Sequence, residues 1–193
     1  MKKKNYIILS VTVMTALLIV SCGSTDKKED TTTPVVKAYG TGTNCVAGDC
    51  LNGKGSAKFS KGELYTGDFN ASKVSGTGVM VWPNGAKYEG NYAENMRDGK
   101  GTYVYNNGDI YIGEYKNNMK NGSGEYKWKD GDNYTGEWKD GKPGGNGTYK
   151  WANGVTYTGQ WKEGMLDGQG TILWPDTSKI TGVFEKNRLV SQN

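Results

Sequence analysis

The chain has 193 residues, of which 24 are basic and 20 acidic, so its formal net charge is +4, and it contains no histidine. The absence of histidine excludes Ser-His and Cys-His nucleophilic sites, and the small net charge without a basic stripe argues against nucleic acid as a partner. The 30 Gly, 13 Tyr and 6 Trp residues point instead to strands and turns.

Residues 1–21 are predicted to be a secretion signal. Three lysines form its charged end, and Ile7–Val20 is an apolar run of 14 residues, too short to span a bilayer comfortably. The run ends in Ile19-Val20-Ser21-Cys22, which resembles the lipobox of bacterial lipoproteins. The resemblance implies cleavage before Cys22, acylation of Cys22 (palmitate, for example) and anchoring to a bacterial membrane in the cell envelope. An ordinary signal peptide cut nearby and an N-terminal membrane helix are the alternatives.

Residues 22–41 would then comprise the lipidated N-terminus and a tether. Gly23–Thr41 is polar, mixed in charge and nearly free of apolar residues, a composition that predicts disorder. A tether of this length would hold the following domain on the order of 25 Å from the membrane. Removal of the signal also removes three lysines, which leaves 21 basic against 20 acidic residues in the mature chain.

Cys45 and Cys50 are the two cysteines that remain once Cys22 is acylated. In an oxidising envelope two cysteines this close usually pair, and a disulfide here would cap the end of a repeat array. A metal site is the alternative, but two thiolates in a chain without histidine make a poor zinc site. We therefore predict a Cys45–Cys50 disulfide, no metal site and no cofactor.

Tyrosine recurs every 23 residues from Tyr65 to Tyr157, and Ile180 continues the series. A glycine follows two positions after each member, as at Gly67 and Gly90. A fixed period of this kind is the signature of a stacked repeat array. We place the array at 42–190, with units beginning at 42, 65, 88, 111, 134 and 157, a partial unit at 180 and a tail at 191–193.

Most aromatic residues fall in four columns of the repeat and are spaced by two within each half of a unit. Period two with aromatic residues predicts strands, and the many glycines argue against helices. Each unit is expected to hold two short strands, such as 88–93 and 101–105, so that about 13 strands would form a sheet ~60 Å long. Residues 180–185 are expected to form the final strand, and 186–193 to trail off.

The strands of one unit are expected to be joined by a polar connection, such as residues 116–121. Three of these connections carry a methionine at a shared position, and these side chains are expected to cover the edge of the sheet; they are Met96, Met119 and Met165.

Consecutive units are joined through segments such as Trp82-Pro83-Asn84-Gly85. Asn-Gly usually indicates a two-residue hairpin loop, but that loop would place the Trp column and the following Tyr column on opposite faces of the sheet. A three-residue loop keeps these aromatic side chains on one face, with Pro83 at the second turn position and Gly85 left-handed in a bulge. We therefore predict the three-residue loop.

The pattern Tyr-x-Gly-x-aromatic, a polar loop, Gly-x-Gly and an aromatic strand closely resembles the MORN (membrane occupation and recognition nexus) repeat family. The match spans roughly Gly42 to Val190. The resemblance implies an all-β fold, an elongated and curved single-layer antiparallel sheet of hairpins with an aromatic groove. It also implies scaffolding, self-association or lipid-head-group contact rather than catalysis. Unit one departs from the pattern, since Gly42 and Asn44 replace its Tyr and first Gly.

The leading hypothesis is a non-enzymatic, membrane-tethered envelope protein that binds a protein partner or itself. The leading Tyr column should be buried, whereas the column beside the turns should be partly exposed and is the candidate binding surface; it contains Trp82, Tyr105, Trp128, Trp151 and Trp174. Binding of a glycan, the cell wall or a lipid head group by the same groove is the alternative. An enzyme is not expected, since Asp68, Glu114 and Glu137 share a column typical of a solvated strand face.

Overall fold

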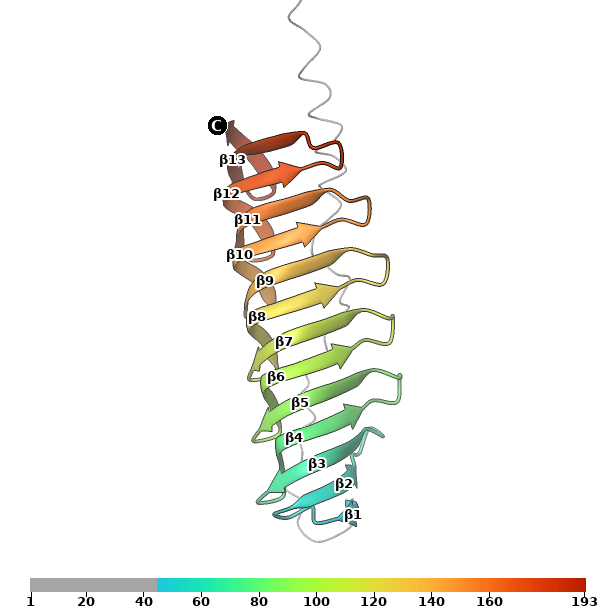
Figure 1. The fold of residues 1–193 in the computed structure, drawn as a ribbon. Helices are drawn as coiled ribbons and strands as arrows, with labels where there is room; N and C mark the ends of the chain where they lie inside the picture. The colour runs from blue at the N-terminus through green and yellow to red at the C-terminus, as the bar shows by residue number, and fades with distance from the viewer. Residues whose placement is uncertain (1–44) are drawn as a thin grey trace, which may run out of the picture.

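The computed structural model describes residues 45–193, which form one open antiparallel sheet of 14 strands and no helix. Every strand pairs with its neighbours in sequence, so the strands stack like rungs along a long array (Figure 1). The strands are β1 (Cys45–Gly48), β2 (Lys54–Lys58), β3 (Leu64–Asn70), β4 (Lys73–Val81), β5 (Lys87–Ala93), β6 (Met96–Val104), β7 (Ile110–Lys116), β8 (Met119–Lys127), β9 (Asn133–Lys139), β10 (Lys142–Lys150), β11 (Thr156–Lys162), β12 (Met165–Leu173), β13 (Lys179–Glu185) and β14 (Arg188–Gln192). The all-β hairpin array expected from the 23-residue period is confirmed.

The recurring glycines make room for the leading tyrosine of each unit. In the pair β5–β6, Gly90 lies opposite Gly101, and a Cβ on Gly101 would lie 2.2 Å from the hydroxyl oxygen of Tyr88. That hydroxyl donates a 3.1 Å hydrogen bond to the carbonyl of Asn91. Any larger residue at Gly101 would therefore displace the ring. The same arrangement recurs at Tyr65, Tyr111, Tyr134 and Tyr157.

A break in strand register bends each unit. Between the pairs Gly90–Gly101 and Tyr92–Arg97, one residue of β5 faces three residues of β6. Gly99 lies in this bulge with a φ of 99°, a backbone conformation that favours glycine. Because the same break recurs in successive units, the strands all bend at the same point, and the sheet is curved along the direction of its strands.

The connection between units is the predicted three-residue loop. The N–H of Gly85 donates to the carbonyl of Trp82 at 2.9 Å, the N–H of Trp82 donates to the carbonyl of Ala86 at 3.0 Å, and Gly85 has a φ of 89°. Because Tyr88 pairs with Met80, the Trp and Tyr columns lie on one face.

The connection within a unit is shorter than expected. It is a two-residue turn in which both residues have positive φ, 50° at Glu94 and 68° at Asn95. The prediction of a polar connection over residues 116–121 was therefore wrong, since β8 begins at Met119. Met119 is a strand residue, 39% exposed, rather than a cover for the edge of the sheet.

The C-terminal end also differs from expectation. Residues 186–193 were expected to trail off, but β14 within them pairs with β13 through Glu185–Arg188 and Phe184–Leu189. The repeat could have predicted this strand, because Leu189 lies one 23-residue period after Leu166 in β12.

The core is a single row of interlocked aromatic rings on one face of the sheet. Each leading tyrosine is fully buried and makes edge-to-face contacts with a ring of its own unit and a ring of the next. Tyr111, for example, lies 5.2 Å from Tyr115 and 5.1 Å from Trp138, measured between ring centroids. Packing therefore links each unit to its nearest neighbours.

Candidate binding surface

The predicted acylation of Cys22 falls outside the residues that the structure describes. From Cys45 onward, no helix is long and apolar enough to cross a membrane, and no group of three or more Cys, Asp or Glu side chains could hold a metal ion. The described features that could form a binding surface are the aromatic columns and the positions at which one unit differs from the others.

A second row of rings runs beside the buried tyrosines and is named the aromatic stripe here. Its members are packed against the core but partly exposed; they are Trp82, Tyr103, Tyr105, Trp128, Trp151 and Trp174. All five groove residues predicted from the sequence belong to it. Two buried rings, Tyr126 and Tyr149, connect its members into a nearly continuous row with centroid separations from 4.4 to 5.6 Å.

The three-residue loops fix the positions of the tryptophans. Trp128 occupies the first position of its loop, where its N–H donates to Asp132 at 3.0 Å and its carbonyl accepts from Gly131 at 3.1 Å. Successive loops also lie close together, since the Ala152 N–H of the next loop donates to the Asp132 carboxylate at 2.8 Å. The stripe is therefore held on a regular framework of stacked loops.

Two carboxylates that the sequence reasoning missed hold the connecting tyrosines: that of Asp109, which is buried, and that of Asp132, which is half-buried. Asp109 accepts hydrogen bonds of 2.9 Å from the Tyr126 hydroxyl and of 2.9 Å from the Lys129 N–H. Asp132 accepts from the Tyr149 hydroxyl and, at 2.8 Å, from the Ala152 N–H. The available signal was an Asp just before the strand together with a Tyr 17 residues later. These bonds fix Tyr126 and Tyr149 and leave the tryptophans as the accessible rings.

Two cations within the groove were also missed. Arg97 and Lys120 occupy a column that elsewhere carries apolar residues, and this column contains Val74, Arg97, Lys120, Pro143, Leu166 and Leu189. Lys120 is only 3% exposed, with its ammonium 4.6 Å from the ring centroid of Tyr126 and 4.9 Å from that of Trp138. A desolvated cation over aromatic faces gains ~2 kcal/mol, which compensates for part of its burial. Burial raises the pKa of Tyr88 to about 12, although the Arg97 guanidinium acts in the opposite direction.

The acidic column on the other face has a structural role beyond solvation. Asp68 accepts from the Lys54 ammonium at 2.6 Å and from the Thr77 N–H at 2.9 Å, and these bonds lower the pKa of its carboxyl to about 2. Glu137 accepts from the Asn146 N–H at 2.8 Å. In both cases the bonded N–H belongs to a residue nine positions later, beside the bulge, so these side chains stabilise the bend in the sheet.

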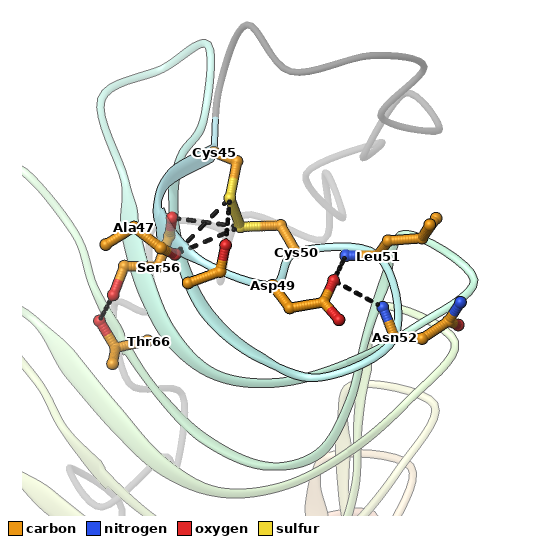
Figure 2. Close-up of a disulfide and its surroundings, with 9 residues drawn as sticks. Cys45, Ala47, Asp49, Cys50, Leu51, Asn52, Ser56 and Thr66 are labelled. Carbon is orange, nitrogen blue, oxygen red and sulfur yellow. Dashed lines mark hydrogen bonds between the residues drawn. A yellow bond between two sulfur atoms is a disulfide. The ribbon is translucent and has the colours of Figure 1, made fainter.

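The predicted disulfide is present between Cys45 and Cys50, with a Cα–Cα distance of 5.9 Å. It closes the turn between β1 and β2, where Asp49 accepts hydrogen bonds from the N–H groups of Leu51 and Asn52 (Figure 2). The bond lies at the N-terminal edge of the sheet, as expected for a cap on the first unit.

Comparison with known proteins gives one family and a distant fold likeness. The MORN repeat model matches five consecutive segments, 65–87, 88–110, 111–133, 134–156 and 157–179. No curated protein matches the chain. Among solved structures, the TCP domain of Drosophila melanogaster SAS-4 (dCPAP), in complex with a proline-rich motif of Ana2 (dSTIL), is 10% identical, with a TM-score of 0.48 over 78% of this chain and 87% of that chain. The TCP10 domain of Danio rerio CPAP is 11% identical, with a TM-score of 0.43 over 73% and 67%.

The five segments that match the MORN repeat model are contiguous, cover more than half of the sequence and begin at the five fully buried leading tyrosines. The 14-stranded hairpin array and its 23-residue period agree with that match. The chain belongs to the MORN repeat family.

Proposed function

We propose that the protein is a non-catalytic scaffold that is tethered to a bacterial membrane and binds a protein partner along the aromatic stripe. The observation that carries this proposal is the contrast between the two aromatic rows. The leading tyrosines are fully buried, whereas the four tryptophans of the three-residue loops, Trp82, Trp128, Trp151 and Trp174, are partly exposed. Partly exposed Trp and Tyr on a rigid framework are the residues that most often dominate protein interfaces.

The geometry of the stripe favours a protein over a glycan. Neighbouring rings are tilted against each other by 36° between Trp82 and Tyr103, 45° between Trp128 and Tyr149, and 50° between Tyr149 and Trp151. They form a ridged row rather than a flat platform on which sugar rings could stack. A ridged apolar row suits the side chains of a protein surface.

The tether is part of the proposal because of the lipobox-like segment before Cys22. Acylation there would keep the array at the surface of one membrane of the envelope, where binding of a partner would localise that partner. Mass spectrometry of the intact protein should find Cys22 at the mature N-terminus with lipid mass on it. Replacement with Cys22→Ser should release the protein from the membrane fraction. An unmodified or differently cleaved N-terminus would end this part of the proposal.

The binding part is tested by truncations on the two faces of the sheet. Trp128→Ala and Trp151→Ala should weaken capture of the partner while costing less stability than truncation of a buried ring, because their rings are partly exposed. Tyr111→Ala should cost about 3–5 kcal/mol, because its ring is buried. Ile112→Ala is the matched control, since Ile112 is 43% exposed on the opposite face.

Capture is measured with a tagged protein and stability by thermal melting of the same samples. A second copy of the chain with a different tag, included among the candidate partners, detects self-association. If Ile112→Ala reduces capture as much as Trp128→Ala does, or if only glycan retention responds to Trp128→Ala, the stripe is not a protein-binding surface.

A further inference from the structure

One unit departs from the repeat at the rim of the two-residue turns. Gly144 in β10 stands where the neighbouring units carry Asp98, Asn121 and Asp167. At the first strand position of the same unit, Lys142 replaces the methionine of three other units. In an array of similar units, a departure that packing does not require is a place to look for a binding site.

Packing does not require the glycine at 144. Its φ lies outside the left-handed range, and a Cβ placed on it would first meet the Cβ of Lys139 at 3.5 Å, an ordinary contact. Gly145 differs, because it has a φ of 66° and a Cβ there would lie 2.5 Å from the carboxyl carbon of Glu137. Gly144 thus omits a side chain that would fit, and its omission leaves open space.

Gly144 is one of the residues that line a cavity of about 500 Å³ on the surface of the array. Its walls include Pro143 and Gly144, both buried, and Trp161, which is 7% exposed. The volume falls within the range of small-molecule pockets, roughly 300–1,000 Å³. The cavity lies between the turns that follow β9 and β11, at the opposite ends of the strands from the loops that carry the aromatic stripe.

The rim of the cavity is basic. Lys139, Lys142 and Lys162 line it, together with the acids Asp140 and Glu163. No ion pair joins any of these lysines to an acid among the residues that the structure describes. The contrast is with Lys73, which occupies the position of Lys142 in an earlier unit and is paired with Glu94. Three ammonium groups against two carboxylates leave the rim with a net charge of +1 (3 − 2), and hence a modestly positive local potential.

We infer that this cavity binds a small organic anion, a carboxylate or a phosphate monoester carried on a ring-shaped body. The three lysines would hold the charged group, and the body would contact the small parts of Pro143 and Trp161 that reach the cavity wall. The site is independent of the proposed aromatic stripe, because the two lie on opposite rims and share no residue.

The test uses the full chain and phenyl phosphate as the probe, followed by ¹H–¹⁵N NMR. The resonances of the Trp161 indole and the Gly144 amide should shift until the site is saturated. Phenol, which lacks the phosphate, and inorganic phosphate, which lacks the ring, should each bind more weakly. Lys142→Met, which restores the residue of the neighbouring units, should weaken binding about threefold to fivefold, the effect of one exposed charge.

Gly144→Asp places a side chain and a negative charge in the wall of the cavity, beside the three lysines, and should abolish the shifts. It should fold, because Asp98 and Asp167 occupy the same position in other units, and thermal melting checks this. Asn121→Asp adds the same charge one unit away and should leave binding unchanged. Equal loss in Gly144→Asp and Asn121→Asp, no saturable shift at Trp161, or binding only to anionic lipid vesicles would each overturn the inference.

Discussion

The side-chain oxygen of Asn118 accepts a 2.8 Å hydrogen bond from the backbone N–H of Arg97, 21 residues earlier in the preceding unit. The N–H of the same asparagine donates to the carbonyl of Arg97 at 3.0 Å. The same pair of bonds joins Asn95 to Val74 and Asn187 to Leu166. Each of these two-residue turns is therefore attached to the previous unit by two hydrogen bonds.

Two of the two-residue turns carry glycine at the position of Asn118, namely Gly141 and Gly164, and a substitution at the first should stabilise the array. Gly141 has a φ of 83°, which asparagine tolerates, and a Cβ there would meet no atom within 4 Å. Gly141→Asn would offer the same side-chain acceptor to the N–H of Lys120, so we expect the free energy of unfolding to rise by about 1 kcal/mol in urea denaturation. Gly164→Asn is the matched control, because it faces Pro143, which has no N–H. Equal gains in the two variants would contradict the hydrogen-bond explanation.

Deletion of one whole unit should be tolerated. Removal of residues 111–133 joins the end of one unit to the start of another, so the remaining strands keep their pairing register. Each leading tyrosine contacts only rings of its own and adjacent units, so a similar ring would replace the one that is lost. We expect a shorter protein with an unchanged circular dichroism spectrum per residue and a slightly lower melting temperature. Removal of residues 111–121 should be far more damaging, since it deletes β7 and places unlike strands side by side. Comparable damage from both deletions would argue against nearest-neighbour stability.

Alkaline pH should unfold the array through its tyrosines. Burial raises the pKa of Tyr88 and of Tyr157 to about 12, whereas an unfolded tyrosine titrates near ~10. The folded state binds these protons more tightly, so their contribution to stability is complete below pH ~10 and is lost as pH rises through about 12. Spectrophotometric titration should show tyrosinate appearing together with loss of the β spectrum. Full ionisation near pH ~10 in a folded protein would contradict the burial of this column.

Reduction of the disulfide should have a modest and local effect. Cys45 and Cys50 are separated by five positions, so their bond closes a short loop and should contribute on the order of 2 kcal/mol to the first unit. In the variant with Cys45→Ser and Cys50→Ser, hydrogen exchange should increase in β1 and β2 while β7 to β12 remain protected. Loss of protection along the whole array would show that the cap is required for every unit.

The sequence predicted most of the fold because its signals are repeated. The three-residue loop at Trp82–Ala86 could be predicted because the alternative loop would have moved the next tyrosine to the wrong face. The two-residue turn at Glu94–Asn95 could not be read in the same way, since neither residue is the glycine that positive φ usually selects. Polar residues before Gly99 therefore suggested a loop where the chain continues as a bent strand.

The candidate site was predictable only in part, for a related reason. The 23-residue spacing of the aromatic residues predicts which of them form the aromatic stripe and places them beside the three-residue loops. That spacing does not predict the hydrogen bonds that Asp109 and Asp132 accept from tyrosines in the second strand that follows each of them along the chain, β8 and β10. It also does not predict a lysine that is buried among four aromatic rings. The cavity could not be predicted either, because Gly144 in its wall is one of 30 glycines and looks in the sequence like one more turn residue.

The nearest-neighbour packing of the tyrosine column has a consequence for how such a chain can change in length. Because each ring meets only its own unit and the next, duplication of any 23-residue window would add one more hairpin, whatever residue the window begins with. Each added hairpin would also bring one more ring to the stripe at the same spacing. Each added unit would therefore lengthen the binding surface by one repeat and raise the avidity for an elongated partner, while the fold stays the same.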